Sequence, residues 1–196
     1  MPGLDIARML RRDAHAAEPE RDATQAPFLR QLRDEWDFYD GEWSRAGFRA
    51  IVVYRLGYWR RGLTFPWRQL LYLPTRFLQR YVRNHYGIEL HPTARIGRRL
   101  ALPHQHGIVV HHFAVIGDDC SIQQGVTICC ATRLDEAPTL GNGVKIGANA
   151  VLMGRIHVGD RATIGPNAVV TMDVPPGATV FAPPPRLIPA PGDTHA

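Results

Sequence analysis

Histidine and cysteine are the side chains of this sequence that could carry out acid–base or nucleophilic chemistry at neutral pH. The chain of 196 residues contains nine histidines and three cysteines. An imidazole titrates at about pH 6.5, so a well-placed histidine can take the proton of an attacking hydroxyl group. His104 and His106 share one short motif, and His111 and His112 follow it. Composition does not select one of them, because a histidine taken alone is more often structural or exposed.

The cysteines do not have the spacing of a metal site or of a disulfide framework. Cys120 stands alone, whereas Cys129 and Cys130 are adjacent. No group of His and Cys residues with ligand spacing surrounds them, so we expect no metal. An odd number of cysteines indicates reduced thiols and a cytoplasmic setting. A glycine-rich phosphate loop of the P-loop or dinucleotide type is also missing from the sequence.

The element that must position these residues is a six-residue repeat. Aliphatic residues recur at every sixth position, with one step of twelve residues and one break of two extra residues. The thirteen positions are Leu90, Ile96, Leu102, Val110, Ile116, Ile122, Ile128, Leu140, Ile146, Leu152, Val158, Ile164 and Val170. Glycine often follows the aliphatic residue. A helix of period 3.6 cannot keep a six-residue repeat on one face.

Period six predicts a mainly β fold, a left-handed parallel β-helix built from hexapeptide repeats. Three hexads make one triangular coil of about 18 residues, in which each side is a short strand and each corner a tight turn. The aliphatic residue points inward and stacks on its counterpart in the next coil. Stacked repeats need caps at both ends. We expect the helical region to cover one end and the proline-rich tail the other.

Changes in residue composition along the chain predict four segments. Residues 1–26 form a polar N-terminal segment, 27–86 an α-helical region, 87–188 the β-helix domain and 189–196 a C-terminal tail. Pro66 and Pro74 are expected to break the helical region, since proline interrupts a helix interior. The first residues contain acids and lack an apolar stretch, which argues against a signal peptide. No apolar run approaches the length of a membrane span.

Six motifs, taken in order, resemble the serine O-acetyltransferases and related acetyltransferases of polysaccharide gene clusters. They are GFRAIVVYRLGYW (47–59), IELHPTARIG (88–97), LPHQHGIVV (102–110), AVIGDDCSIQQGVTI (114–128), APTLGNGVKIGANAVLMG (137–154) and DVPPGATV (173–180). The resemblance covers roughly residues 47–188. It implies acetyl-CoA as the acyl donor. It also implies a homotrimer or a dimer of trimers, with active sites in the clefts between neighbouring β-helices.

The resemblance assigns the catalytic roles. His104 matches the general base of the family, which removes the proton of the acceptor hydroxyl as its oxygen attacks the thioester. Glu89 falls where these enzymes carry an acid that holds the other nitrogen of the histidine and stabilises the imidazolium. An exposed acid at a coil corner is an equally good interpretation of Glu89. His106, His111 and His112 are interpreted as solvated or structural.

The resemblance also indicates where the cofactor would bind. The positions that match the CoA-binding residues are Cys130, Ala148 and Pro166, with Arg186 near the closing segment. Ala148 and Pro166 are 18 residues apart, one full coil, so they should lie on one side of the β-helix. Lys145 and Arg186 are candidates for charge-assisted contacts to the phosphates of CoA. Each of these basic residues could also be an ordinary surface charge.

Several positions depart from the family pattern. Pro103 replaces the aspartate before the catalytic histidine, and Glu136-Ala137 replaces an arginine–histidine pair that helps hold the amino-acid acceptor. We therefore expect an O-acetyltransferase acting on a sugar or another small-molecule alcohol, with free L-serine a poor substrate. The alternatives are a serine O-acetyltransferase of cysteine biosynthesis and a non-catalytic trimeric binding module.

The chain is basic, with a formal net charge of +5 and a pI of about 9.5. Residues 43–88 hold nine arginines among many aromatics and contain no Asp or Glu. The favoured interpretation is an amphipathic helical cap with solvated arginines. The second is a peripheral contact with the inner face of a membrane, since basic residues beside aromatics suit an anionic interface. Nucleic-acid binding is the least favoured.

Overall fold

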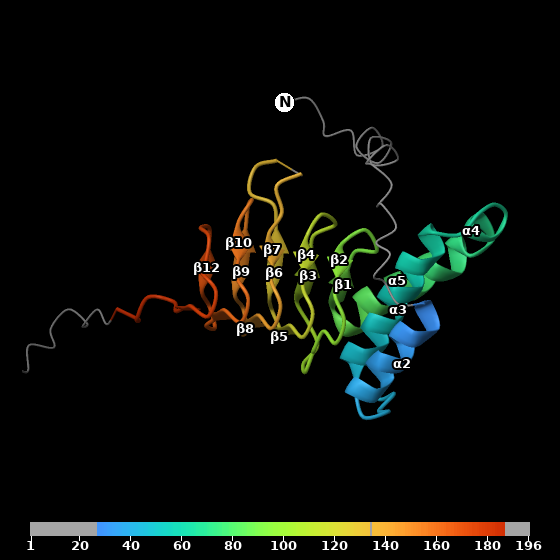
Figure 1. Ribbon diagram of the computed structural model, residues 1–196, viewed down its shortest axis with the longest axis horizontal. Coiled ribbons are helices and arrows are strands. Elements are labelled where there is room, and N and C mark those ends of the chain that lie inside the picture. The colour runs from blue at the N-terminus through green and yellow to red at the C-terminus, as the bar shows by residue number, and fades with distance from the viewer. Residues whose placement is uncertain (1–26, 134, 187–196) are drawn as a thin grey trace, which may run out of the picture.

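The computed structural model describes residues 27–133 and 135–186, which form a helical region followed by a column of short strands (Figure 1). The helices are α2 (Phe28–Phe38), α3 (Ala46–Arg61), α4 (Trp67–Leu70) and α5 (Tyr72–Tyr86). The strands are β1 (Ile88–Leu90), β2 (Arg95–Ile96), β3 (Ile108–Val110), β4 (Val115–Ile116), β5 (Ser121–Ile122), β6 (Thr127–Cys129), β7 (Thr139–Leu140), β8 (Lys145–Ile146), β9 (Val151–Met153), β10 (His157–Val158), β11 (Thr163–Ile164), β12 (Val169–Val170) and β13 (Thr179–Val180).

The strands form three parallel sheets that the chain visits in turn. The first sheet has the order β1-β3-β6-β9-β12, the second β2-β4-β7-β10 and the third β5-β8-β11-β13. Strands that are neighbours within a sheet lie one coil apart in sequence, which is the topology of a solenoid. The predicted parallel β-helix of hexapeptide repeats is therefore confirmed, with a helical region at its N-terminal end.

The aliphatic residues of the repeat stack inside the coils, as the period of six predicts. In the first sheet, Leu90 pairs with Val110, Val110 with Ile128, Ile128 with Leu152 and Leu152 with Val170. All five side chains are buried. Residues on either side of them point outward, because successive side chains of a strand alternate between its two faces. The β-helix thus has a dry, narrow core and three exposed faces.

Two corners of the β-helix carry the active-site candidates. The His104 corner joins the third sheet to the first through residues 102–107, 123–126, 147–150 and 165–168. The Cys130 corner joins the first sheet to the second through residues 91–94, 111–114, 130–138 and 154–156. The two irregular steps of the repeat fall at these corners. The two extra residues after Leu102 enlarge the first, and the step of twelve after Ile128 is a loop rather than another strand.

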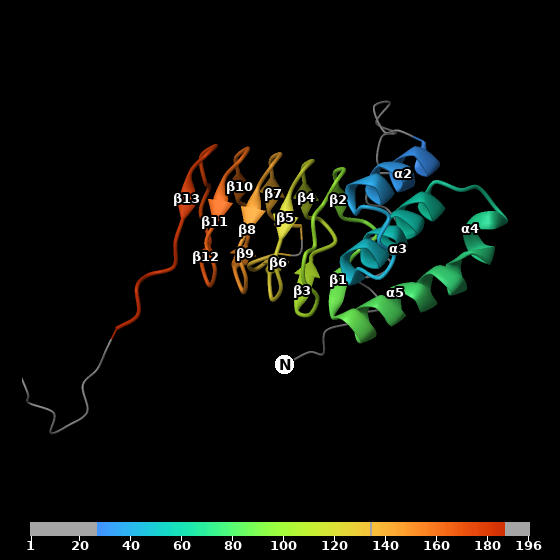
Figure 2. The same ribbon diagram turned by 90° about the horizontal axis from the view of Figure 1, so that it is seen from below.

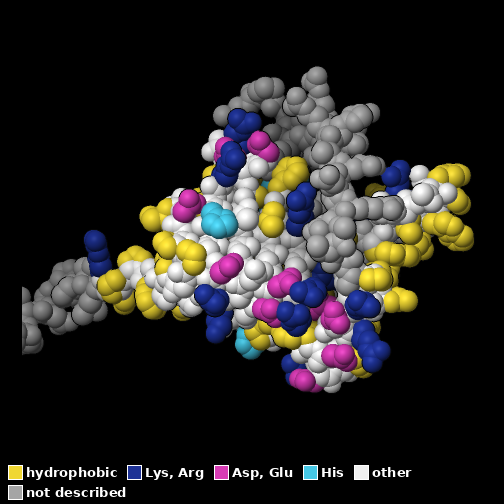
Figure 3. Space-filling view, viewed as in Figure 1, with side chains coloured by type: hydrophobic (Ala, Val, Ile, Leu, Met, Phe, Trp, Pro, Cys, Tyr) yellow, Lys and Arg dark blue, Asp and Glu magenta, His cyan; other side chains and the backbone are white. Residues whose placement is uncertain are grey.

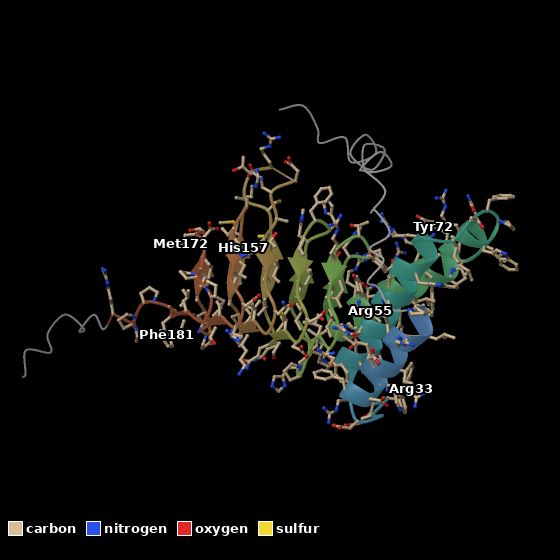
Figure 4. All side chains as sticks on the ribbon, in the orientation of Figure 1. Arg33, Arg55, Tyr72, His157, Met172 and Phe181 are labelled. Carbon is tan, nitrogen blue, oxygen red and sulfur yellow. The ribbon has the colours of Figure 1, made fainter. Side chains whose placement is uncertain are left out.

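The helices cover the open edge of the first coil. The Tyr54 hydroxyl donates to the carbonyl of Ala94 at 2.8 Å and accepts from the N–H of Ile96 at 3.1 Å. Arg55 donates to the carbonyls of Ile96 and Gly97, and it pairs with the buried Glu35 at 2.7 Å. Figure 4 shows Arg55 where the helices meet the coils. These contacts pair the backbone groups that an uncovered sheet edge would leave open.

Proline breaks the helical region at only one of the two expected positions. Pro66 directly precedes α4, where the chain turns after α3. Pro74 instead lies inside the first turn of α5. There its missing N–H has no partner within the helix and its fixed φ suits a helix start, so the helix continues through it.

The far end of the β-helix is more open than expected. Residues 181–186 have no regular structure and lead away from the last coil (Figure 2). This described part of the proline-rich tail therefore does not close the end. The expectations for residues 1–26 and 189–196 lie outside the described residues. Within the described part of the chain, the helices are too short or too polar to cross a membrane.

Candidate active site

His104 lies in an exposed loop whose two ends are held by hydrogen bonds from backbone N–H groups. At its start, the N–H of Leu102 donates to the Tyr39 hydroxyl at 2.9 Å. At its end, the N–H of His106 donates to the carbonyl of Tyr86 at 2.8 Å, and the His106 carbonyl accepts from the N–H of Gly125 at 3.0 Å. The anchored ends fix the position of the loop, while the His104 side chain remains open to a substrate.

Glycines make this corner narrow. Gly107 and Gly125 both have φ of +73°, a left-handed conformation that glycine adopts without steric cost. A Cβ atom on Gly125 would lie 2.0 Å from the side-chain oxygen of Asn149 in the next coil. The coils therefore stack closely along the His104 corner.

Glu89 borders the same corner. It lies in the middle of β1, exposed on the outer face, and pairs with Val109 of β3. Two residues earlier, Gly87 lies directly against His106. In the described part of the chain, no hydrogen bond joins Glu89 to the His104 ring. Glu89 also lines a cavity between α5 and the first coil, together with Arg76, Arg80 and Arg83. Its orienting role remains a prediction.

The candidate CoA residues divide between two corners. Ala148 and Pro166 lie one coil apart in the His104 corner, and the N–H of Asn167, next to Pro166, donates to the carbonyl of Ala148 at 2.8 Å. Lys145 is exposed on β8 of the adjoining third sheet, and Arg186 is exposed beyond the last strand of that sheet. Cys130 lies in the other corner. Within one chain, the first sheet separates it from the His104 loop.

Gln124 is a polar residue of the His104 corner that our sequence interpretation missed. Its backbone carbonyl accepts from the N–H of Asn149 at 2.9 Å. Its side-chain oxygen is buried and has no hydrogen-bond partner among the described residues. Buried polar atoms are usually paired, so this oxygen is available to a ligand donor in the corner. The signal in the sequence was a glutamine directly before Gly125, between the repeat positions Ile122 and Ile128.

The inserted loop of the Cys130 corner projects from the β-helix (Figure 1). It carries an exposed ion pair between Arg133 and Asp135 at 3.2 Å. The hydrogen bond from Arg133 holds the pKa of Asp135 below its usual value. Glu136 and Ala137 follow and are half-buried. At the base of this loop, an acidic residue, Glu136, and an apolar residue, Ala137, therefore stand where the resemblance implies an arginine and a histidine.

Histidines in close ring contact line the Cys130 corner in the two preceding coils. The rings of His111 and His112 lie 4.0 Å apart, and those of His91 and His112 lie 5.5 Å apart. Burial, assisted by His112, lowers the pKa of His111. In the described residues, no group of three or more His, Cys, Asp or Glu side chains could hold a metal ion.

The cysteines have the properties of compact packing residues. Burial raises the pKa of the Cys120 thiol and of the Cys129 thiol above the ordinary value. A raised pKa keeps a thiol protonated and poorly nucleophilic at neutral pH. The Cys129 carbonyl accepts from the N–H of Gly154 in the next coil at 3.0 Å. Neither feature points to cysteine catalysis.

The relatives of this chain share its fold and its repeat. Residues 137–171 match the family described as bacterial transferase hexapeptide (six repeats). The chain is 37% identical over 204 residues to the serine acetyltransferase of Salmonella typhimurium, covering 98% of this chain and 70% of that enzyme. The solved serine acetyltransferase of Brucella abortus strain S19 superposes with a TM-score of 0.68 at 33% identity, covering 85% of this chain and 71% of that one. Soybean serine acetyltransferase complexed with serine superposes with a TM-score of 0.65 at 31% identity, covering 82% and 68%.

Proposed function

Because the chain belongs to the serine acetyltransferase family and is therefore an acyltransferase, we propose that it transfers an acetyl group from acetyl-CoA to the hydroxyl of L-serine. One observation carries the choice of acceptor: the similarity to serine acetyltransferases extends through the helical region and the β-helix alike. It is not limited to the hexapeptide repeat that many acyltransferases share. Family membership also leaves no support for a non-catalytic binding module.

In this proposal His104 is the general base. Its neutral imidazole takes the proton of the serine hydroxyl while the hydroxyl oxygen attacks the thioester carbonyl carbon. The tetrahedral intermediate collapses by breaking the carbon–sulfur bond, and the departing thiolate receives the proton from the imidazolium. Glu89 is a positioning residue in this scheme, since a carboxylate beside the second ring nitrogen stabilises the imidazolium. The accessible His104 loop supports this assignment.

The CoA arm is proposed to run along the His104 corner. Ala148 and Pro166 leave room for the pantetheine chain, because neither side chain projects far from the coils. The buried Gln124 oxygen can accept a hydrogen bond from a pantetheine amide or from the serine ammonium group. Lys145 and Arg186 are proposed to pair with the phosphates as charge-assisted donors.

The position of Cys130 supports a homotrimer. In one chain it lies across the first sheet from the His104 loop, so both cannot line the same CoA site. When the Cys130 corner of one subunit faces the His104 corner of the next, they form one cleft. Cyclic symmetry then gives three equivalent clefts. The oligomer is proposed to be this trimer or a dimer of two trimers.

A sugar or another small alcohol is the second candidate acceptor. Our sequence-based preference for it is not supported by the relatives, whose names specify serine. One observation still favours this second candidate. Pro103 offers no partner for the ammonium group of a bound serine, and Glu136 and Ala137 offer no cation for its carboxylate. A sugar hydroxyl needs no such charged partners.

The deciding experiment measures thiol release from acetyl-CoA with a panel of acceptors. We expect L-serine to be acetylated with kcat/KM of at least about 10⁴ M⁻¹s⁻¹, in the range of natural substrates. The panel includes D-serine, L-homoserine, glycerol and several hexoses. A hexose used more than about 100-fold better than L-serine, a difference of about 2.7 kcal/mol, would establish the second candidate instead. Thiol release with none of them would refute both acceptors.

A further inference from the structure

The end of the helical region has a large apolar surface that faces outward. Phe65, which precedes α4, is 79% exposed, Leu73 of α5 is 74% exposed and Phe77 of α5 is 69% exposed. Trp67 and Leu70 of α4 are also largely exposed. Figure 3 shows hydrophobic side chains gathered over α4 and the adjoining part of α5. Apolar patches of this kind mark interaction sites on folded proteins.

This surface is distinct from the face of α5 that packs on the rest of the protein. Thr75, Val82 and Tyr86 are the buried residues of α5, and Val82 and Tyr86 belong to the common core. Leu73, Phe77 and Tyr81 recur at every fourth position and lie on another side of the same helix. The helix is thus apolar on two sides, and only one of them has a partner in the described chain.

Arginines border the outward apolar face. Arg76 and Arg80 are exposed on α5 beside Leu73 and Phe77, and Arg68 is exposed on α4. Within residues 27–133 and 135–186, none of these three forms an ion pair. No Asp or Glu occurs anywhere in residues 43–88. Among the described residues, Glu89, which lines a cavity with Arg76 and Arg80, is the one acid beside them, and it forms no ion pair with either. The surface therefore combines apolar side chains with an excess of positive charge.

This chemistry selects among the possible occupants. Two copies that met through this surface would bring their arginines together, which is electrostatically unfavourable. A nucleic acid would pair with the arginines but offers little to a cluster of leucines and phenylalanines. An anionic bilayer offers negative headgroups above an apolar interior. The headgroups can pair with the arginines, and the interior can accept the apolar side chains.

We propose that the α4–α5 surface, consisting of Phe65, Trp67, Leu70, Leu73 and Phe77 with Arg68, Arg76 and Arg80, docks on an anionic lipid bilayer. The apolar side chains enter the headgroup region, and the arginines pair with lipid phosphates. Figures 1 and 2 place α4 at the end of the helical region away from the β-helix. Docking there leaves both corners of the β-helix in water, so the enzyme works at the membrane surface. This inference does not depend on the identity of the acceptor.

The test is cosedimentation of the full chain with vesicles of phosphatidylcholine mixed with phosphatidylglycerol, compared with pure phosphatidylcholine. Binding is expected only with the anionic vesicles. It should weaken strongly between about 0.1 M and about 1 M salt, where the Debye length falls from about 10 to about 3 Å. Equal binding to both vesicle types, or no binding at low salt, would overturn the proposal.

Matched variants distinguish binding through the α4–α5 surface from a general loss of positive charge or apolar surface. Arg76→Gln/Arg80→Gln should reduce partitioning about 20- to 30-fold, at about fivefold for each arginine near the bilayer. Arg95→Gln/Arg155→Gln removes the same charge from exposed positions on the β-helix and should bind normally. Leu73→Ser/Phe77→Ser should reduce partitioning at least about tenfold. The control Met172→Ser/Phe181→Ser, at the opposite end of the molecule (Figure 4), should leave partitioning into the vesicles unchanged.

Light scattering on the same variants tests the competing occupants. Each α4–α5 variant is expected to keep the molar mass of the parent protein. A lower mass for Leu73→Ser/Phe77→Ser, with unchanged vesicle binding, would show that a second copy covers the surface. Stronger binding to duplex DNA than to the anionic vesicles, lost in Arg76→Gln/Arg80→Gln, would show a nucleic-acid site. Either result would refute the membrane proposal.

Discussion

The hydroxyl of Tyr39 accepts a hydrogen bond of 2.9 Å from the N–H of Leu102, 63 residues further along the chain. The same hydroxyl donates to the carbonyl of Leu100 at 2.8 Å. A residue next to α2 therefore holds the segment from which the His104 loop departs. Through this contact the helical region contributes to the geometry of the proposed active site as well as covering the first coil.

Replacing Tyr39 with phenylalanine should lower the free energy of unfolding by about 1–3 kcal/mol. The change leaves a buried N–H and a buried carbonyl without their partner. Denaturant unfolding of the parent and the variant measures the difference. Tyr72→Phe is the control, because the Tyr72 side chain is exposed on the outer surface and its substitution should have little effect. Equal losses in the two variants would contradict the bridging role of Tyr39.

The stability of the protein should fall in alkaline solution because of its buried tyrosines. Burial raises the pKa of Tyr39 to about 12, and burial raises that of Tyr54 as well. An unfolded tyrosine titrates at about 10. The unfolded state therefore loses its proton first, and the contribution of Tyr39 is complete below pH of about 10 and is lost as pH rises toward about 12. Unfolding curves across this interval should show a shallower decline for Tyr39→Phe than for the parent.

Replacing His104 with asparagine should lower kcat by roughly 10²–10⁴-fold, the usual contribution of a general base. His106→Asn is the matched control two residues away. His106 has φ of +74°, which asparagine tolerates, and its backbone makes the anchoring hydrogen bonds. We expect this control to keep most of its activity. A near-normal kcat for His104→Asn would remove His104 from the mechanism.

Replacing Gly125 with alanine should destabilise the β-helix by at least about 1–2 kcal/mol, the cost of a left-handed conformation for a residue with a Cβ. The close approach to Asn149 adds to this cost. Thermal or denaturant unfolding measures it. Gly62→Ala at the end of α3 is the control, since its φ is −80° and the nearest atom to a new Cβ lies at 3.5 Å. A Gly125→Ala protein as stable as the control would contradict the tight corner.

Restoring two of the three lost family residues should improve the use of L-serine. Pro103→Asp supplies a partner for the ammonium group, and Ala137→His supplies one for the carboxylate. A charge-assisted hydrogen bond contributes about 1.5–3 kcal/mol, so each change should raise kcat/KM for serine roughly 10- to 100-fold. Acetyl transfer to serine and to a hexose is compared in each variant. Improvement with the hexose alone would argue against serine as the acceptor.

The repeat made the β-helix predictable from the sequence. An inward side chain at every sixth position is a local property, and each coil repeats it without reference to distant residues. The six-residue period predicts the buried stacks of aliphatic residues and the two irregular steps of the repeat. It also predicts that Ala148 and Pro166 share one corner. The motif around His104 predicted a general base, and only the structure shows that His104 lies in an exposed loop.

Contacts between distant segments were decided only by the tertiary structure. The period shows that Cys130 and His104 both lie at corners, but only the order of the sheets shows that these corners differ. Tyr54 and Arg55 looked like members of the basic aromatic stretch 43–88, and Tyr39 was not singled out. The hydrogen bonds of all three to the first coil depend on how α2 and α3 dock. The same holds for α5, which has apolar residues on two sides. Burial requires a partner surface, and packing placed Val82 and Tyr86 against the core while it left Leu73 and Phe77 facing outward.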